Sequence, residues 1–215
     1  MRHGEDARAK HELLPLFPLG LVLVPGELLP LHIFEERYKR LIAECRDSGA
    51  PFGIVFSRDE GLAVVGCTAR VGAVLGELPD GRSNIVVRGG ERFRLVELRP
   101  PDLPDVEPVR AVVEYLHDAP GEVSVELTET VERLFTRALE LTDATPPTRG
   151  PQDVPRSFQI AGVFEIEPVV KQRLLQLQDE AGRLGLLATF FDALVQRLEL
   201  LQSREEAIRG NGKGT

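Results

Sequence analysis

Long apolar runs, tryptophan and a cysteine framework are all missing from this sequence, and each absence excludes a class of protein. No apolar run reaches the roughly 20 residues that a transmembrane helix needs, because the most apolar stretch, 13–24, is interrupted by two prolines and a glycine. The first ten residues are polar and contain no signal-peptide core. The two cysteines, Cys45 and Cys67, are too few for a disulfide framework and are expected to be buried and inert. We therefore expect a cytoplasmic protein that makes no contact with a membrane.

Basic charge and catalytic motifs are also scarce. The chain has 26 Lys and Arg against 34 Asp and Glu, a net charge of −8, whereas nucleic-acid binders usually carry a basic patch or a high pI. The phosphate-binding motif GxxxxGK[ST], the dinucleotide motif GxGxxG, the nucleophile motif GxSxG and the metal motifs HExxH and CxxC do not occur. The sequence therefore predicts no nucleic-acid partner, no cofactor, no metal site, no catalytic residues and no enzymatic activity.

The first half of the chain has the pattern of many short strands. Between 13 and 115 it is rich in Val, Leu and Phe, and Gly or Pro recurs every six to twelve residues, which is typical of strands that close into a barrel or sandwich. Asp80-Gly81 is the strongest hairpin signal, and the spacing over 35–47 predicts one helix. Strands are expected over 13–17, 22–24, 28–33, 52–56, 62–70, 71–78, 84–88, 93–98 and 109–115.

The second half changes to helical periodicity. Helices are expected over 123–141, 157–164, 168–177 and 179–203, with a proline-rich loop over 145–155. The apolar stripe from Leu184 to Leu201 favours a seam within the chain over a coiled-coil dimer. The predicted fold class is therefore α+β, with a β-rich subdomain over 12–117, a helical subdomain over 120–204, and flexible tails over 1–11 and 205–215.

One cluster of arginines lies at the end of the β-rich half. Strand alternation places Arg92 and Arg94 on one face and Phe93 and Leu95 on the other. Two interpretations are open: a solvated sheet face paired with neighbouring glutamates, or the polar rim of a groove for an extended peptide. His32, between two apolar residues, is expected to be a hydrogen-bonded histidine in the core or at a contact between subdomains rather than a ligand. The cluster consists of Arg82, Arg88, Arg92, Arg94 and Arg99.

Several short segments resemble a known protein module in their residues and their order. They are LPLFPL at 14–19, VPG at 24–26, LPLHIFEERY at 29–38, FGIV at 52–55, VGCTA at 65–69, DGR at 80–82 and GGERFRL at 89–95. In the second half, KQRLL at 171–175 and RL at 183–184 add to the match. Over about 13–203 the chain resembles the N-terminal substrate-binding domain of the ATP-dependent protease Lon.

This resemblance implies a PUA-like barrel with one helix, followed by a helical subdomain. It also implies a stand-alone protein that has a recognition module but neither an ATPase nor a protease domain. The expected function is non-catalytic binding of unfolded or extended polypeptide segments, with a protease as a further possible partner. The alternatives are a docking or adaptor subunit for a separate protease or regulator, a Lon-related ATP-dependent peptidase fragment, and an RNA binder.

Two kinds of binding site for a peptide are possible in such a fold. An extended peptide could add to a free strand edge through main-chain hydrogen bonds, or lie in a cleft between the subdomains. The motifs assign no binding residue; Arg37, Tyr38, Arg92 and Phe93 are the candidates for a peptide-binding surface. Arg37 and Tyr38 are equally suited to fixing the first helix to the barrel.

Overall fold

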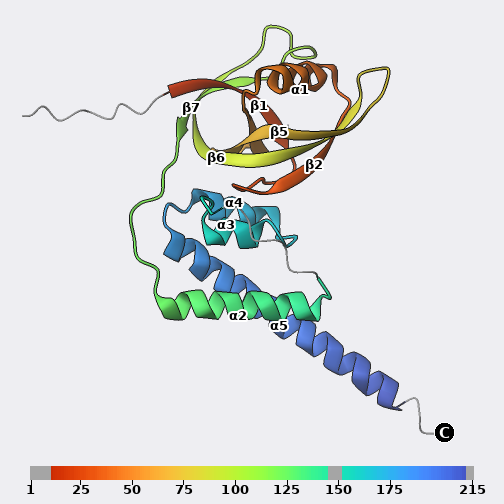
Figure 1. Cartoon of the computed structure of the whole chain (residues 1–215), viewed down its shortest axis with the longest axis vertical. Coiled ribbons are helices and arrows are strands. Elements are labelled where there is room, and N and C mark those ends of the chain that lie inside the picture. Colours follow the sequence, from red (N-terminus) through yellow and green to blue (C-terminus); the bar gives the residue numbers. More distant parts are fainter. Residues whose placement is uncertain (1–10, 145–151, 212–215) are drawn as a thin grey trace, which may run out of the picture.

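The computed structural model describes residues 11–144 and 152–211, and it places a sheet-rich first half above a helical second half (Figure 1). The first half contains β1 (His11–Leu19), β2 (Leu28–Ile33), α1 (Glu36–Ser48), β3 (Phe52–Arg58), β4 (Gly61–Leu62), β5 (Val65–Glu77), β6 (Ser83–Arg99) and β7 (Arg110–Tyr115). The second contains α2 (Val125–Leu141), α3 (Arg156–Ala161), α4 (Pro168–Gln176) and α5 (Glu180–Asn211). The predicted order of a β-rich half with one helix and then a helical half is confirmed.

The strands form a closed path, which we call the strand ring. Their order is β1-β7-β6-β5-β3-β4, and β1 also pairs with β3 in parallel, so the path returns to its start. β2 pairs only with the first part of β6 among the described strands. The helix α1 covers the end of the ring that lies away from the helical half (Figure 1).

The centre of the strand ring is filled by one aromatic side chain. Phe93 is fully buried, and its ring occupies the space that two glycines leave open. A Cβ on Gly53 would lie 2.7 Å from the Phe93 ring, and a Cβ on Gly66 would lie 2.6 Å from it. Three of the short motifs that carry the resemblance, FGIV, VGCTA and GGERFRL, therefore meet at the Phe93 ring. Gly53 and Gly66 are glycines because a side chain at either position would overlap with that ring.

Two predicted pairs of short strands are single long, bent strands. β5 runs through the expected break at 70–71 with register shifts on either side of it. β6 runs through Gly89-Gly90, opposite an irregularity in β5. A Cβ on Gly89 would lie 2.1 Å from the carbonyl oxygen of Val24, so glycine lets the strand bend and approach the 22–24 segment. That segment is buried but forms no strand, contrary to the prediction.

The helical half is built on the pair α2 and α5. Ser124 caps α2, because its hydroxyl accepts a hydrogen bond from the Leu127 amide at 3.2 Å. The predicted stripe on α5 is buried within the chain at Leu187 and Phe191, and α2 packs along it. The helix α5 continues to Asn211, into the segment from 205 that was predicted as a flexible tail. The tail at 1–10 and the loop at 145–151 lie outside the described residues.

Both cysteines, Cys45 of α1 and Cys67 of β5, are free and buried, which predicts that their thiols react slowly. Burial raises the pKa of the Cys45 thiol to about 11, and burial also raises the pKa of Cys67. At pH 8 only about one Cys45 thiol in a thousand is then a thiolate. We expect neither cysteine to react with a thiol reagent in the native protein, and both to react in denaturant. Stoichiometric labelling of the folded protein within minutes would contradict this.

Candidate functional site

Three adjoining hollows run across the boundary between the strand ring and the helical half, and together we call them the junction groove. Their volumes are about 650, 430 and 300 Å³. The first two share Asp118, Asp153, Val154 and Pro155, and the last two share Gly90 and Glu91. Because neighbouring hollows share lining residues, they lie side by side from the start of α3 to the outer surface of β5 and β6.

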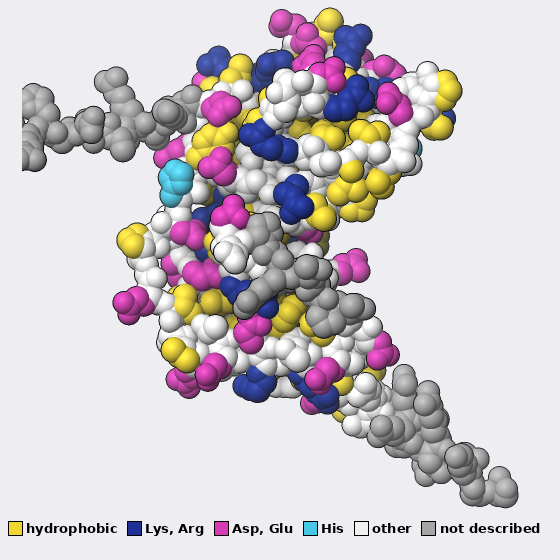
Figure 2. All heavy atoms as spheres, in the orientation of Figure 1, with side chains coloured by type: hydrophobic (Ala, Val, Ile, Leu, Met, Phe, Trp, Pro, Cys, Tyr) yellow, Lys and Arg dark blue, Asp and Glu magenta, His cyan; other side chains and the backbone are white. Residues whose placement is uncertain are grey.

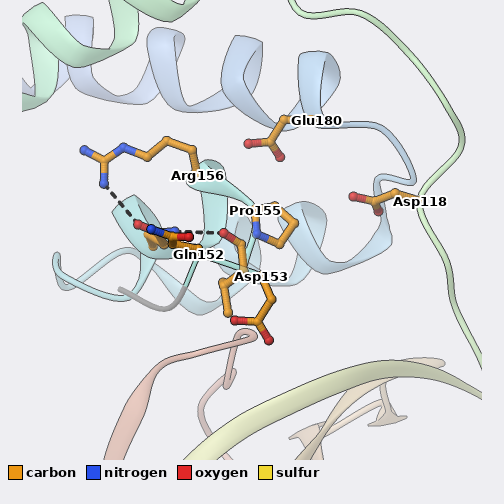
Figure 3. Close-up of a pocket in the computed structure, with 8 residues that line it drawn as sticks. Asp118, Gln152, Asp153, Pro155, Arg156 and Glu180 are labelled. Atoms are coloured by element: carbon orange, nitrogen blue, oxygen red, sulfur yellow. Dashed lines mark hydrogen bonds between the residues drawn. The ribbon is translucent and has the colours of Figure 1, made fainter. Parts of the chain in front are cut away.

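The largest hollow lies on the helical side and is shown in Figure 3. Asp118, from the segment after β7, and Glu180, at the start of α5, lie on one side of Pro155. Gln152 and Asp153 lie on the other side. Hollows of a few hundred cubic ångström are of the size that binds ligands, but this lining is charged and open, which favours a polar chain over a small apolar molecule.

The floor of the groove is a buried polar network centred on Arg92. Its guanidinium donates to the carbonyl oxygens of Leu175 at 2.8 Å and Leu177 at 2.6 Å, and it pairs with Asp118. Arg92 belongs to β6, whereas Leu175 belongs to the last turn of α4 and Leu177 directly follows that helix. Since the Arg92 side chain is only 4% exposed, this network ties the strand ring to the helical half in a desolvated setting.

Arg183 completes the network from the helical side. It is fully buried, pairs with Asp118 and donates to Glu180 at 2.8 Å. Its Nε also donates to the Ser157 hydroxyl at 2.9 Å, and that hydroxyl donates to Glu180 at 2.6 Å. Asp118 thus accepts from two guanidinium groups of different halves of the chain, and removing it would leave two buried cations facing each other.

Both guanidinium groups lie over the ring of Phe158. The ring centroid is 5.4 Å from Arg92 Cζ and 4.6 Å from Arg183 Cζ, within the range of a cation–π contact. Burial lowers the pKa of Arg92. Burial acts in the same direction on Arg183, but the hydrogen bonds with Asp118 and Glu180 outweigh it, so the pKa of Arg183 is raised. Both side chains stay charged at physiological pH, and the network is structural rather than acid–base machinery.

A second set of polar contacts between the two halves lies beside the Arg92 network. Lys171 of α4 pairs with Glu27, just before β2, at 2.5 Å, and both side chains are nearly buried. Next to it, the Gln172 amide donates to the carbonyl oxygen of Val65 at 2.8 Å. Together with Arg92, these contacts hold the helical half against the side of the strand ring on which the groove lies.

The free edge of β2 is the other predicted kind of binding place, and its backbone disfavours strand addition. The Gly89 amide donates to the Glu27 carbonyl, so by antiparallel alternation Leu29, Leu31 and Ile33 direct their backbone groups toward β6. Pro30 therefore sits in the middle of the outward edge, where it offers no N–H. An added strand would lose a central hydrogen bond, so the junction groove is the better candidate.

The four candidate residues do not come together into one site. Phe93 is in the centre of the strand ring, and Arg92 lines the groove but is almost entirely buried. Tyr38 is buried and stacks on Phe17, with ring centroids 3.9 Å apart. Arg37 binds Glu35 and lies over the Tyr38 ring at 4.8 Å, at the far end of the strand ring. This geometry fits the second reading of Arg37 and Tyr38, in which they fix α1.

The remaining arginines of the cluster divide between the two interpretations. Arg99 pairs with Glu97 at 2.8 Å and Arg82 pairs with Asp80 at 2.7 Å, as on a solvated face. Arg88 lines the middle hollow of the groove, as the groove reading requires. His32 is exposed, not interior as expected, and its Nδ1 lies 2.8 Å from the Asn84 side-chain oxygen. Successive side chains of β2 point to opposite faces of the sheet, so the strand that buries Ile33 exposes His32.

The sequence analysis missed most residues that build the groove. Asp118, Asp153 and Val154 lie in segments without periodicity, where no local pattern assigns a role. One signal was available: Arg183 lies beside Leu184 on the buried stripe of α5, and a buried arginine requires a carboxylate partner. That argument predicts an acidic partner but does not identify it as Asp118.

The sequence matches one protein family and several of its members. The family model for the ATP-dependent protease La (LON) substrate-binding domain matches residues 13–192. A Lon protease of Porphyromonas gingivalis is 28% identical over 94% of this chain, and one of Paraburkholderia phytofirmans is 27% identical over 94%. In each case the match covers 27% of the relative, so the chain spans about a quarter of the length of these curated relatives.

Solved structures give the same result at the level of the fold. A Lon N-terminal domain protein from Xanthomonas campestris superposes with a TM-score of 0.62 and 27% identity, covering 83% of this chain and 98% of that one. The N-terminal domain of the Mycobacterium avium complex Lon protease gives a TM-score of 0.59 at 16% identity, which speaks for the fold alone. No helix within 11–144 and 152–211 is long and apolar enough to cross a membrane.

Proposed function

The chain belongs to the LON substrate-binding domain family, and we propose that it is a non-catalytic module that holds extended polypeptide segments in the junction groove. The observation that carries the proposal is that the three hollows adjoin one another and that both halves of the chain line the middle one. Its walls combine apolar side chains with a charged rim, as a polypeptide of varied sequence requires. Binding of this kind is tolerant of sequence and correspondingly weak.

The apolar wall supplies the variants for a test. Leu116 and Val154 line the middle hollow and are both half-buried. We expect the double variant Leu116→Gln/Val154→Gln to weaken binding of reduced, alkylated α-lactalbumin, a permanently unfolded protein, by on the order of tenfold. Fluorescence titration of the labelled polypeptide measures the effect, with affinities expected between micromolar and millimolar.

The matched control is Val96→Gln/Leu98→Gln, because both side chains are about half exposed on the strand ring and line none of the three hollows. It should leave binding unchanged. If both double variants lost the same affinity for α-lactalbumin and kept their thermal midpoints, the assignment of binding to the groove would be wrong. Absence of any binding by the native protein would sink the proposed function.

The enzymatic alternative has a separate test. Incubation of the protein with ATP and casein should give no proteolysis above background, because no motif for nucleotide binding or peptide hydrolysis occurs in the sequence. ATP-dependent cleavage would establish a peptidase fragment. A docking role beside a separate protease is compatible with groove binding, and α5 provides a long helix for such a contact.

The finer features of the fold follow as part of the proposal. The closed path of strands supports the PUA-like barrel that the resemblance implies. The boundary proposed between 117 and 120 falls in the segment that contains Asp118, so the two subdomains share a buried network. Cytoplasmic location and the absence of a nucleic-acid partner stay predictions from composition.

A further inference from the structure

The outer face of the sheet formed by β2, β6 and β5 carries apolar side chains that nothing in the described structure covers. Strand register aligns the outward positions of the three strands in rows, such as Leu28 beside Arg88 beside Arg70. We call this surface the hairpin face. The exposed apolar side chains of this region are Leu28 at 55%, Phe34 at 59%, Leu78 at 47% and, at a register shift near the end of the hairpin, Leu75 at 68%.

The hairpin face is concentrated in one region of the molecule. In Figure 2, hydrophobic side chains gather beside β2 and at the end of the β5–β6 hairpin. Pro30 and Val86 lie in the row between Leu28 and His32, so apolar groups follow one another along the face. Apolar side chains that gather exposed on one face of a sheet in this way mark an interaction surface more often than single exposed ones do.

The charges on this face have one sign. The outward positions hold Arg88, Arg70 and Arg82 but no aspartate or glutamate, although the chain has a net charge of −8. Arg82 is neutralised by Asp80. Within the part of the chain that the structure describes, Arg70 and Arg88 donate only to backbone carbonyls and have no carboxylate within 4.0 Å. The face therefore combines apolar contact area with two arginines that form no ion pair, although Glu91 lines the same hollows as both of them.

We propose that the hairpin face binds extended polypeptide segments in which apolar residues alternate with glutamate or aspartate. Apolar side chains of the segment would cover Leu28, Leu75 and Phe34, while its carboxylates would pair with Arg88 and Arg70. This inference rests on the proposed polypeptide-binding function and names its preferred chemistry. Arg88 also lines the groove, so the hairpin face continues the path of a bound chain out of the groove.

The test compares two synthetic peptides that differ only in charge. One is a labelled ten-residue peptide of alternating leucine and glutamate, and the other has glutamine at every glutamate. Fluorescence anisotropy should give about tenfold tighter binding of the glutamate peptide at low salt, and the ratio should shrink as ionic strength rises. Equal affinities at low salt would overturn the proposal.

Variants then locate the site. Leu28→Asp/Leu75→Asp should abolish glutamate-peptide binding, and the milder Leu28→Gln/Leu75→Gln should weaken it. Arg88→Gln should remove most of the preference for glutamate. The control Leu13→Asp/Leu98→Asp changes exposed apolar residues that lie outside the hairpin face, and it should have no effect. Loss of binding in the control, or none in the hairpin-face variants, would overturn the proposal.

The remaining outcomes separate this inference from the groove and from other occupants. If Leu116→Gln/Val154→Gln abolishes binding of unfolded α-lactalbumin while the hairpin-face variants leave both probes unaffected, the groove stands and the hairpin face falls. Self-association in sedimentation velocity that Leu28→Asp/Leu75→Asp abolishes would assign the face to a second copy instead. Binding to phosphatidylserine vesicles without peptide binding would assign it to a lipid surface, and either result overturns the proposal.

Discussion

Asp118→Ala is expected to destabilise the protein by about 3–5 kcal/mol, because it leaves two buried guanidinium groups without their shared carboxylate. Arg92 and Arg183 are 4% and 0% exposed, so after the substitution water can reach them only through the space that the 32% exposed Asp118 side chain leaves. For a chain of this size the loss corresponds to a drop of roughly 10 °C in Tm. Differential scanning calorimetry and urea unfolding both measure it.

Two further variants make this prediction specific to the network. Arg92→Met should cost less in the Asp118→Ala background than in the native protein, since it removes one of the stranded charges. Arg137→Ala is the control, because Arg137 pairs with Glu199 at 2.9 Å on the exposed surface of the helical half. It should leave Tm unchanged, as exposed ion pairs contribute little. Additive losses for Asp118 and Arg92 would contradict the shared-carboxylate account.

Gly53→Ala and Phe93→Leu are expected to be strongly coupled, because both change the same space in the centre of the strand ring. Gly53→Ala alone should cost about 1–3 kcal/mol by overpacking. Its new methyl group would lie 2.7 Å from Leu16 Cδ2 and 2.7 Å from the Phe93 ring. Because these are ends of side chains, replacing the phenyl ring by the smaller leucine should relieve the contact. The double variant should therefore lose less stability than the sum of the two single variants.

Gly66→Ala provides the comparison for this pair. Its methyl group would lie 2.6 Å from the Phe93 ring but also 2.6 Å from the Ile54 carbonyl oxygen, which is backbone and does not move with the side chain. Phe93→Leu should therefore fail to rescue Gly66→Ala. Chemical denaturation of the three single and two double variants measures these losses of stability. If Phe93→Leu restored the stability of Gly66→Ala as fully as that of Gly53→Ala, the contact with the Ile54 carbonyl oxygen would not be the cause of the loss.

The sequence was a good guide to the elements and a poor one to the groove, for a physical reason. Apolar periodicity is local, so it predicted β2 over 28–33 and α4 over 168–177 almost to the residue. Where bends decide the structure, it failed: β6 continues through Gly89-Gly90 because these glycines permit an approach to Val24, a contact with a distant segment. Local patterns carry no information on such contacts.

The candidate site shows the same limit. Arg92 was singled out as a surface residue because strand alternation turned it away from Phe93, and that orientation is correct. What alternation could not give is the helical half that covers Arg92, because Leu175 and Leu177 lie more than eighty residues further along the chain. Family resemblance supplied the fold that contains these contacts, but its motifs consist mainly of prolines, glycines and apolar residues that fill the interior.

The position of Asp118 has a consequence for how this protein can be divided. A fragment that ends at 117 would carry Arg92 without its carboxylate, and a fragment that starts at 120 would carry Arg183 with Glu180 but without Asp118. Each fragment would expose charged side chains on the surface that had been packed against the other half. Gene fusion, truncation or domain transplantation therefore has to move both halves together, and the smallest transferable unit is the whole of the ring with its helices.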